Sequence, residues 1–94
     1  MEYNINMRDL ERTLKALANR RRLAILGYLK QKQEATVGEI AGKIKLSFKA
    51  TSKHLGILTA ADIIEHEQRS LQVYYRIISP KLLSPAARSI ISLL

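Results

Sequence analysis

The segment from Leu46 to Leu58 constrains the fold most, because its residues predict a short helix with two chemically different faces. One side repeats core-type residues at intervals of three and four positions. These are Phe48, Thr51, Leu55 and Leu58. The other side is small, polar and cationic, and it carries Lys49, Ser52, Lys53 and Gly56. Such a helix packs one face on a core and can present the other to the major groove of B-DNA. An ordinary solvated helix face is the alternative.

A second short helix is predicted directly before this one. Thr36 and Glu39 have the spacing of a capping box, in which each side chain accepts a hydrogen bond from the other's backbone. Only Lys45 and Leu46 then precede Ser47, the expected N-cap of the next helix. A connection of this length is typical of a helix-turn-helix unit.

Two amphipathic helices are predicted upstream of this unit. The first runs from about Met7 to Ala18, and Asn19 is expected to end it and to cap the second. The buried stripe of the second helix is expected at Leu23, Leu26 and Leu29.

Downstream, the pattern changes to one typical of strands. Ile63–Glu67 and Gln72–Ile78 are rich in β-branched and aromatic residues, and a polar segment separates them, which predicts a β-hairpin. Tyr74 and Tyr75 would point to opposite faces of the second strand, so at least one is expected to pack into the core. Pro80 and Pro85 each follow a serine, as at helix starts, so the last helix is expected to be short, kinked or divided at Pro85.

The charge balance favours a polyanionic partner. Lys and Arg number 16 against 8 Asp and Glu, a formal net charge of +8. DNA is a better candidate than a membrane surface, because no apolar run approaches the roughly 18 to 20 residues of a spanning helix. The first six residues also lack the features of a signal peptide, so we expect a cytoplasmic protein.

Several function classes are disfavoured. The chain has no cysteine, which excludes disulfides, thiol switches and cysteine-bound zinc. It has no glycine-rich phosphate loop, no nucleophile motif and no carboxylate pair suited to acid–base chemistry, so an enzyme is not expected. We predict a mainly α fold with a small β-hairpin: a winged helix-turn-helix flanked by N- and C-terminal helices at about 7–18 and 80–94, in one domain spanning 1–94.

The order and spacing of these segments resemble the arsenical-resistance repressor (ArsR) family of winged helix-turn-helix regulators. The resemblance covers about Leu14 to Ile78. It rests on Leu17–Leu26, Glu39–Ala41, Leu46–Ser47, Ser52–Leu55 with Leu58, and Val73–Arg76. It implies a dimeric repressor whose first and last helices form the dimer interface, with double-stranded DNA as the partner.

The resemblance also implies DNA contacts on the recognition helix at Phe48, Lys49, Ser52 and Lys53. The last three form the face obtained from periodicity. His54, on the same helix, is a further candidate contact. Phe48 takes the place of a polar residue that is usual in the family, and we expect it to staple the helix start to the core rather than to contact a thymine methyl group.

Further basic candidates lie outside this helix. Arg20, Arg21 and Arg22 fall in a first helical turn, where the helix dipole disfavours cations. The resemblance implies a structural role for Arg22, which leaves Arg20 and Arg21 as candidate phosphate contacts or as a solvated basic patch. Arg69, at the hairpin tip, is a candidate wing contact, although the neighbouring Glu65 and Glu67 would oppose one.

The flanking helices carry a large apolar load that predicts a two-fold dimer. The candidate interface residues are Met7, Leu10, Leu14, Ile90, Ile91 and Leu94. Packing of both helices on their own domain is the alternative. A two-fold dimer would place two recognition helices about one turn of DNA apart and predicts an inverted-repeat operator.

No metal or cofactor is expected. His54 and His66 are the only histidines and show no ligand spacing. The thiolates of metal-sensing family members would fall at Thr36 and Gly38, and the last helix contains no His or carboxylate ligand. The sequence therefore predicts a sequence-specific DNA-binding regulator, a homodimeric repressor with an unknown effector. A winged-helix protein-interaction module and a non-specific architectural DNA binder are the alternatives.

Overall fold

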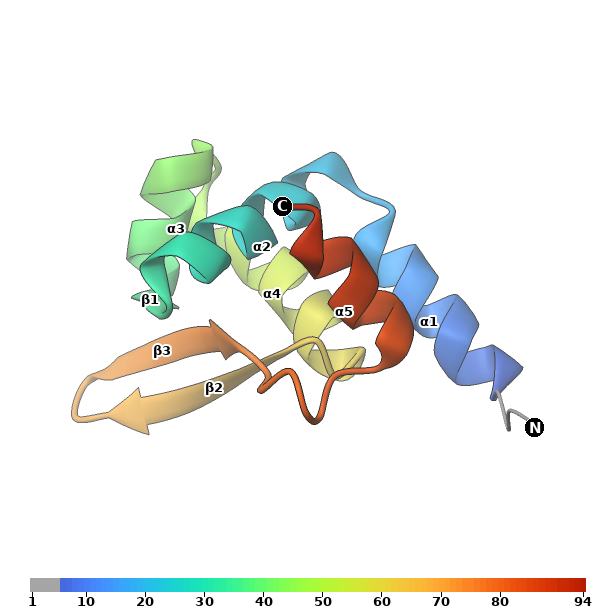
Figure 1. Ribbon diagram of the computed structural model, residues 1–94. Helices are drawn as coiled ribbons and strands as arrows, with labels where there is room; N and C mark the ends of the chain where they lie inside the picture. Colours follow the sequence, from blue (N-terminus) through green and yellow to red (C-terminus); the bar gives the residue numbers. More distant parts are fainter. Residues whose placement is uncertain (1–5) are drawn as a thin grey trace.

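The computed structural model describes residues 6–94, and within that range it is a winged helix-turn-helix flanked by a helix on each side (Figure 1). The elements in chain order are α1 (Met7–Leu17), α2 (Arg20–Lys32), β1 (Ala35–Thr36), α3 (Val37–Ile44), α4 (Phe48–Ala60), β2 (Ile64–Arg69), β3 (Gln72–Ile77) and α5 (Pro85–Ser92). The predicted fold class is confirmed. The prediction that the chain has no signal peptide used the first six residues, and residues 1–5 lie outside the described range.

Capping side chains set the starts of the helices, as the sequence predicted. The Asn19 side chain accepts hydrogen bonds from the backbone amides of Arg21 and Arg22. Thr36 and Glu39 form the reciprocal capping box. Ser47 caps α4, and a cap of this kind contributes about 1 kcal/mol to stability. These local bonds fix where each helix of the DNA-binding unit begins.

The core lies where α2, α3, α4 and the base of the hairpin meet. Its fully buried aliphatic side chains are Ile25, Leu26, Leu29, Ile40, Leu55, Leu58, Ile63 and Ile64. The predicted stripe of α2 was partly wrong, because Leu23 is only half-buried and Ile25 is fully buried. Helix α2 has neighbours on several sides, including α3, α4 and β3, so its buried surface is wider than one stripe.

The sheet has the order β1-β3-β2, and all its pairs are antiparallel. The β2–β3 hairpin extends away from the helices (Figure 1), with Ser70 and Leu71 at its turn. Tyr75 packs against the core, as expected for at least one of the two tyrosines. The two-residue strand β1 was not predicted; it pairs Ala35 with Tyr75 and ties the hairpin to the start of α3.

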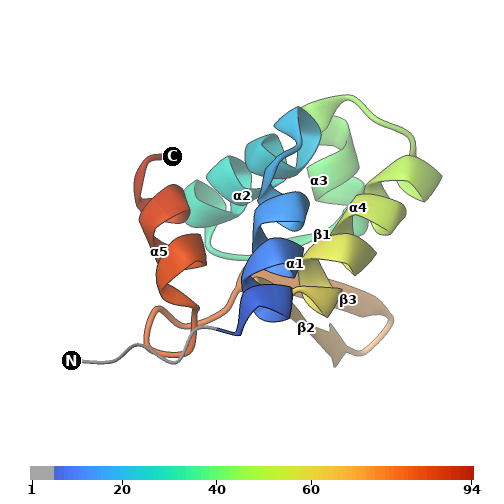
Figure 2. The same ribbon diagram turned by 90° about the vertical axis from the view of Figure 1, so that its right-hand side faces the viewer.

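The last helix is shorter than the predicted 80–94. The amides of Leu82 and Leu83 donate to the Ser79 carbonyl in a separate turn, and α5 begins only at Pro85, after its Ser84 cap. The predicted division at Pro85 is therefore confirmed. Helices α1 and α5 lie side by side at one end of the molecule, with α4 on the other side of α1 (Figure 2). None of the described helices is long and apolar enough to cross a membrane.

Candidate nucleic-acid interface

The outer face of α4 is open and cationic. Lys49, Lys53 and Gly56 are exposed and Ser52 is half-buried. A Cβ atom added at Gly56 would meet no atom within 4 Å, so nothing in the described chain covers this part of the helix. The opposite face is anchored, because Thr51, Leu55 and Leu58 are fully buried and the Thr51 hydroxyl donates to the Ser47 carbonyl at 2.8 Å. The structure thus brings Lys49, Ser52 and Lys53 together on one surface.

Phe48 does not staple α4 to the core. Its side chain is 64% exposed at the first position of the helix. The expected staple was wrong, because the core contacts of α4 begin at Thr51, one turn later. An exposed aromatic ring beside Lys49 and Ser52 is the kind of group that contacts a thymine methyl in the major groove. That contact stays a prediction.

Arg22 joins the end of α1 to the recognition helix. Its Nε donates to the Ala16 carbonyl at 2.6 Å and its Nη2 donates to the Lys15 carbonyl at 3.1 Å. Its Nη1 lies 3.2 Å from Nδ1 of His54 on α4. A guanidinium is also well placed electrostatically at a helix C-terminus. The structural role that the family resemblance implied for Arg22 agrees with these contacts.

His54 therefore packs inside the domain more than the candidate contact role suggested. A guanidinium only donates hydrogen bonds, so Nδ1 accepts from Arg22 and the ring proton is assigned to Nε2. Burial lowers the pKa of His54, and the positive charges of Arg22, Arg21 and Lys53 lower it further. The neutral ring links α4 to α2.

Arg20 and Arg21 present their guanidinium groups to solvent at the start of α2. Within residues 6–94 neither forms a side-chain hydrogen bond or a salt bridge that would neutralise it. Arg21 lies close enough to His54 to lower its pKa, which puts this positive charge near α4. Both residues are available for phosphate contact, which remains a prediction.

The wing carries an ion cluster that sequence reasoning missed. Arg69 binds both carboxylate oxygens of Glu34, at 2.7 and 2.8 Å, and one oxygen of Glu67 at 2.9 Å. Arg76 donates to Glu65 at 2.9 Å and to Glu67 at 3.0 Å. The guanidinium of Arg69 lowers the pKa of Glu34, and hydrogen bonds from Arg69 and Arg76 lower that of Glu67.

The wing contact expected of Arg69 stays a prediction, and this cluster bears on it. Three carboxylates outnumber two guanidinium groups, so the cluster adds a net negative charge, not a positive one, to the wing. The Arg69 guanidinium also lies 4.7 Å from the centre of the Tyr74 ring, which holds it against the hairpin. A phosphate that contacts Arg69 would compete with Glu34 and Glu67 for its positive charge. The sequence predicted that Glu65 and Glu67 would oppose a wing contact. It gave no sign of Glu34, which is 35 residues from Arg69 in the sequence.

The candidate dimer residues divide into two groups. Met7 and Leu14 on α1 are 74% and 47% exposed, and Leu94 is also exposed. Leu10 and Ile90 are half-buried. Ile91 is wrong as a purely intermolecular residue, because it is 8% exposed and belongs to the core of its own chain. Helix α5 packs on α1 and α2, which occupies the side that carries Ile91.

The described residues offer no ready metal site. No three His, Asp or Glu side chains between residues 6 and 94 gather in a way that would hold a metal ion.

The chain matches known proteins over most of its length. A family model described as a helix-turn-helix domain matches residues 17–67. The transcriptional activator HlyU of Vibrio cholerae is 32% identical over 85 residues, which cover 83% of this chain and 78% of HlyU. Nodulation protein NolR of Rhizobium meliloti is 40% identical over 62 residues, which cover 66% of this chain and 50% of NolR.

Solved structures agree with these sequence matches. HlyU of Vibrio cholerae superposes with a TM-score of 0.78 at 31% identity, covering 97% of this chain and 92% of HlyU. The homodimeric winged helix-turn-helix DNA-binding domain of Mb0332 from Mycobacterium bovis, a possible ArsR-family transcriptional regulator, gives a TM-score of 0.80 at 31% identity. That match covers 93% of this chain and 76% of the other.

Proposed function

The chain belongs to the ArsR family of winged helix-turn-helix DNA-binding transcriptional regulators, and from this premise we propose that it is a homodimeric repressor that binds an inverted-repeat operator. The observation that carries the proposal is the open cationic face of α4, held on a fully buried opposite face. In this proposal the protein binds DNA rather than catalysing a reaction, and it does so in the cytoplasm.

In the proposed mechanism, one set of residues provides affinity for DNA and another set recognises the base sequence. Arg20, Arg21 and Lys49 contact phosphates and release counterions, which sets affinity and makes it depend on salt. Ser52 and Lys53 read base edges in the major groove, where a lysine recognises the acceptors of guanine. Phe48 contacts a thymine methyl group at the start of the helix. The wing adds little positive charge, because Arg69 is already bound by carboxylates.

The proposed dimer uses the end of the molecule formed by α1 and α5 (Figure 2). Its exposed apolar side chains are Met7, Leu14, Leu93 and Leu94. Burying them in a second copy would remove apolar surface that a monomer leaves in water. The homodimeric state in the name of the Mb0332 structure supports this assignment. A two-fold axis there places the two α4 helices on successive major grooves.

Repression in this proposal requires only that the dimer occupies its operator. A dimer bound across a promoter excludes the polymerase without any additional contact. HlyU is a transcriptional activator. A reporter gene placed downstream of the operator therefore tests separately whether this protein represses or activates transcription.

A selection from a random DNA library, made with the purified protein at two salt concentrations, tests the proposal. We expect an enriched inverted repeat whose half-site centres lie about 10 base pairs apart, bound more tightly at low salt. Lys53→Ala should reduce enrichment of the repeat, whereas Lys81→Ala, an exposed lysine in the turn before α5, should not. Salt-sensitive binding without a motif would indicate an architectural DNA binder, and absence of binding would indicate a protein-interaction module.

A further inference from the structure

The side chain of Glu34 joins the body of the domain to the tip of the wing. Glu34 lies in the connection between α2 and β1, and Arg69 is the last residue of strand β2. Both carboxylate oxygens of Glu34 accept hydrogen bonds from Arg69, at 2.7 and 2.8 Å. The positive charge at the tip is therefore held by a residue that does not belong to the wing.

Carboxylates occupy both edges through which the Arg69 guanidinium could bind a phosphate. Glu34 occupies the end-on edge, which is formed by Nη1 and Nη2. Glu67 occupies the side edge, where its Oε1 accepts from Nε at 3.3 Å and from Nη2 at 2.9 Å. Because arginine binds phosphate in bidentate fashion through such an edge, no complete pair of donors remains free on Arg69.

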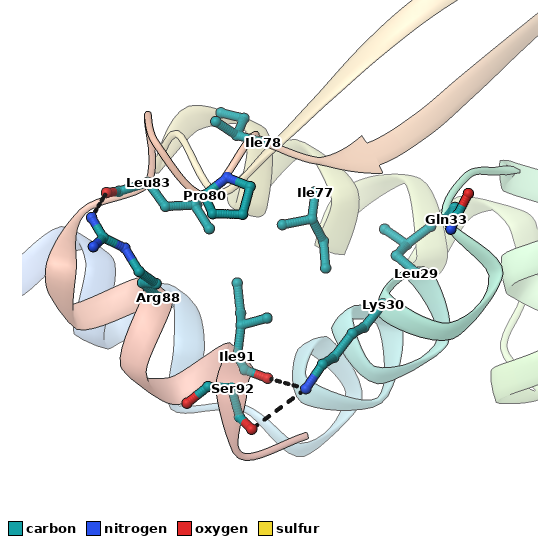
Figure 3. A pocket seen from close by; sticks show the side chains of 10 residues that line it. All are labelled: Leu29, Lys30, Gln33, Ile77, Ile78, Pro80, Leu83, Arg88, Ile91 and Ser92. Atoms are coloured by element: carbon teal, nitrogen blue, oxygen red, sulfur yellow. Dashed lines mark hydrogen bonds between the residues drawn. The ribbon is translucent and has the colours of Figure 1, made fainter.

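Two other arginines are held in place without losing their charge. Arg88 donates to the backbone carbonyl of Leu83 at 3.2 Å (Figure 3). Arg22 donates to the backbone carbonyl of Ala16 at 2.6 Å. A backbone carbonyl is neutral, so it positions a guanidinium without compensating its positive charge. The contact from Glu34 differs because it also compensates the charge that would attract a phosphate.

Glu34 is the member of the cluster whose loss would free Arg69. Within residues 6–94 its carboxylate bonds to Arg69 alone, whereas Glu67 also accepts from Arg76 at 3.0 Å. Without Glu34 the end-on edge would open, while Glu67 and the ring of Tyr74 would still hold the guanidinium against the hairpin. The Glu34 and Arg69 side chains are 36% and 43% exposed, so an incoming phosphate can reach them.

We propose that Glu34 is a positioning residue that lowers the affinity of the protein for DNA by keeping Arg69 from the phosphates. This inference rests on the proposed function, because the wing lies beside the duplex only when α4 enters the major groove. Phosphate contacts position a protein on DNA but do not read its sequence. Glu34 therefore weakens binding to every duplex and leaves recognition of the bases to α4.

Fluorescence anisotropy with the full chain, on the selected operator and on a random duplex, tests this role. Glu34→Gln keeps the size of the side chain and removes its charge. We expect tighter binding by about fivefold for each of the two wings, the upper value for an exposed ion pair. The salt slope should steepen by about 1.8, because each wing gains one phosphate contact at about 0.9. Both changes should be the same for the two duplexes.

Variants of Arg69 show whether the gain comes through its guanidinium. Arg69→Ala alone should leave the affinity near the wild-type value, because Arg69 is withheld from DNA in the wild type. Combined with Glu34→Gln, it should remove the whole gain. A gain that survives in the double variant, or an equal loss from Arg69→Ala in both backgrounds, would overturn the proposal. Circular dichroism checks that each variant keeps the fold.

Asp62→Asn is the matched control for the change in net charge. The Asp62 carboxylate accepts from Arg12 at 3.4 Å, and its backbone φ of 58° is one that asparagine adopts readily. Asp62 follows the C-terminal end of α4, a helix of 13 residues that spans about 20 Å. Charges more than about 10 Å apart are largely screened, so Asp62→Asn should change affinity by less than about twofold. Equal gains from Asp62→Asn and Glu34→Gln would overturn the proposal.

A phosphate probe separates this proposal from the proposed function. Inorganic tripolyphosphate should shift the Nε–H resonance of Arg69 in NMR spectra of Glu34→Gln but not of the wild type. That result, together with no binding of any duplex, would reject the proposed function and leave the role of Glu34 standing. Equal shifts in the two proteins, or a shift in neither, would overturn the role of Glu34 even if the operator binds.

Discussion

Replacing Arg22 with Ala removes the side chain that joins the end of α1 to the recognition helix. The guanidinium makes two hydrogen bonds to carbonyls in the last turn of α1 and one to His54 on α4. Arg20 and Arg21 are its neighbours in sequence but are exposed and make no such contacts within residues 6–94. Alanine variants of Arg20 and Arg21 therefore serve as controls for the alanine variant of Arg22.

The structure sets the size of the effect. A hydrogen bond from a charged donor contributes about 1.5 to 3 kcal/mol, but water can replace Arg22 at the exposed carbonyl of Lys15. Counting mainly the bonds to Ala16 and His54, we expect Arg22→Ala to lower the free energy of unfolding by about 2 to 3 kcal/mol. For a domain of this size, that corresponds to a decrease in Tm of about 10 to 20 °C.

Urea unfolding followed by circular dichroism measures this difference. All variants are compared at one protomer concentration, because dimerisation would couple to stability. Arg20→Ala and Arg21→Ala should lie within about 0.5 kcal/mol of the wild type, or slightly above it, since they remove cations from a helix N-terminus. Arg22→Lys keeps the charge but not the fork of donors and should recover only part of the loss. An Arg22→Ala variant as stable as Arg20→Ala would refute the reasoning.

Three further predictions concern salt, pH and assembly. Lys49→Ala should reduce the salt slope of operator binding by about 1.8, since a dimer loses two phosphate contacts at about 0.9 each. Arg69→Ala should leave the slope near the wild-type value, and a larger change at Arg69 would contradict its neutralisation by carboxylates. Because the folded state lowers the pKa of His54 below 6.5, protons bind the unfolded chain more readily, and stability should fall as pH drops below that value. Urea unfolding at about pH 7.5 and about pH 5.5 should show a smaller loss in His54→Gln, and an equal loss in both proteins would exclude His54 as the cause. Leu14→Glu should shift the protein to monomer in sedimentation velocity with an unchanged circular dichroism spectrum, and an intact dimer would remove α1 from the interface.

The features that the sequence predicted well are those that neighbouring residues determine. Asn19, Thr36 and Ser47 each satisfy backbone amides two or three positions away, so a short segment contains the whole interaction. The buried positions Leu55 and Leu58 also followed from helical period, because α4 packs one face against the rest of the domain. The cationic face of α4 was predicted for the same reason.

Interactions between distant segments could not be predicted in this way. Glu34 neutralises Arg69 only because β1 pairs with β3 and brings the connection between α2 and β1 beside the wing. A two-residue strand has too short a pattern to be recognised before its partner is placed. The wing therefore looked more basic in the sequence than it is in the structure.

Helical periodicity also cannot show whether an apolar residue packs within its own chain or stays exposed at the surface. Ile91 and Leu94 are both apolar residues near the C-terminal end, yet the first is buried in its own chain and the second is exposed. Phe48 has the period of the core stripe but precedes the point where α4 meets its neighbours. In both cases the period grouped the apolar residues, and the tertiary contacts decided which of them are buried.

The spacing of the operator tests the central claim most directly. Fluorescence anisotropy would compare binding to the selected inverted repeat with binding to the same sequence carrying about five additional base pairs between the half-sites, which rotates one half-site by about half a turn. A homodimer with two fixed α4 helices predicts a loss of about a thousandfold, towards non-specific affinity. Equal affinity for the two DNAs would contradict a two-fold dimer that reads both half-sites.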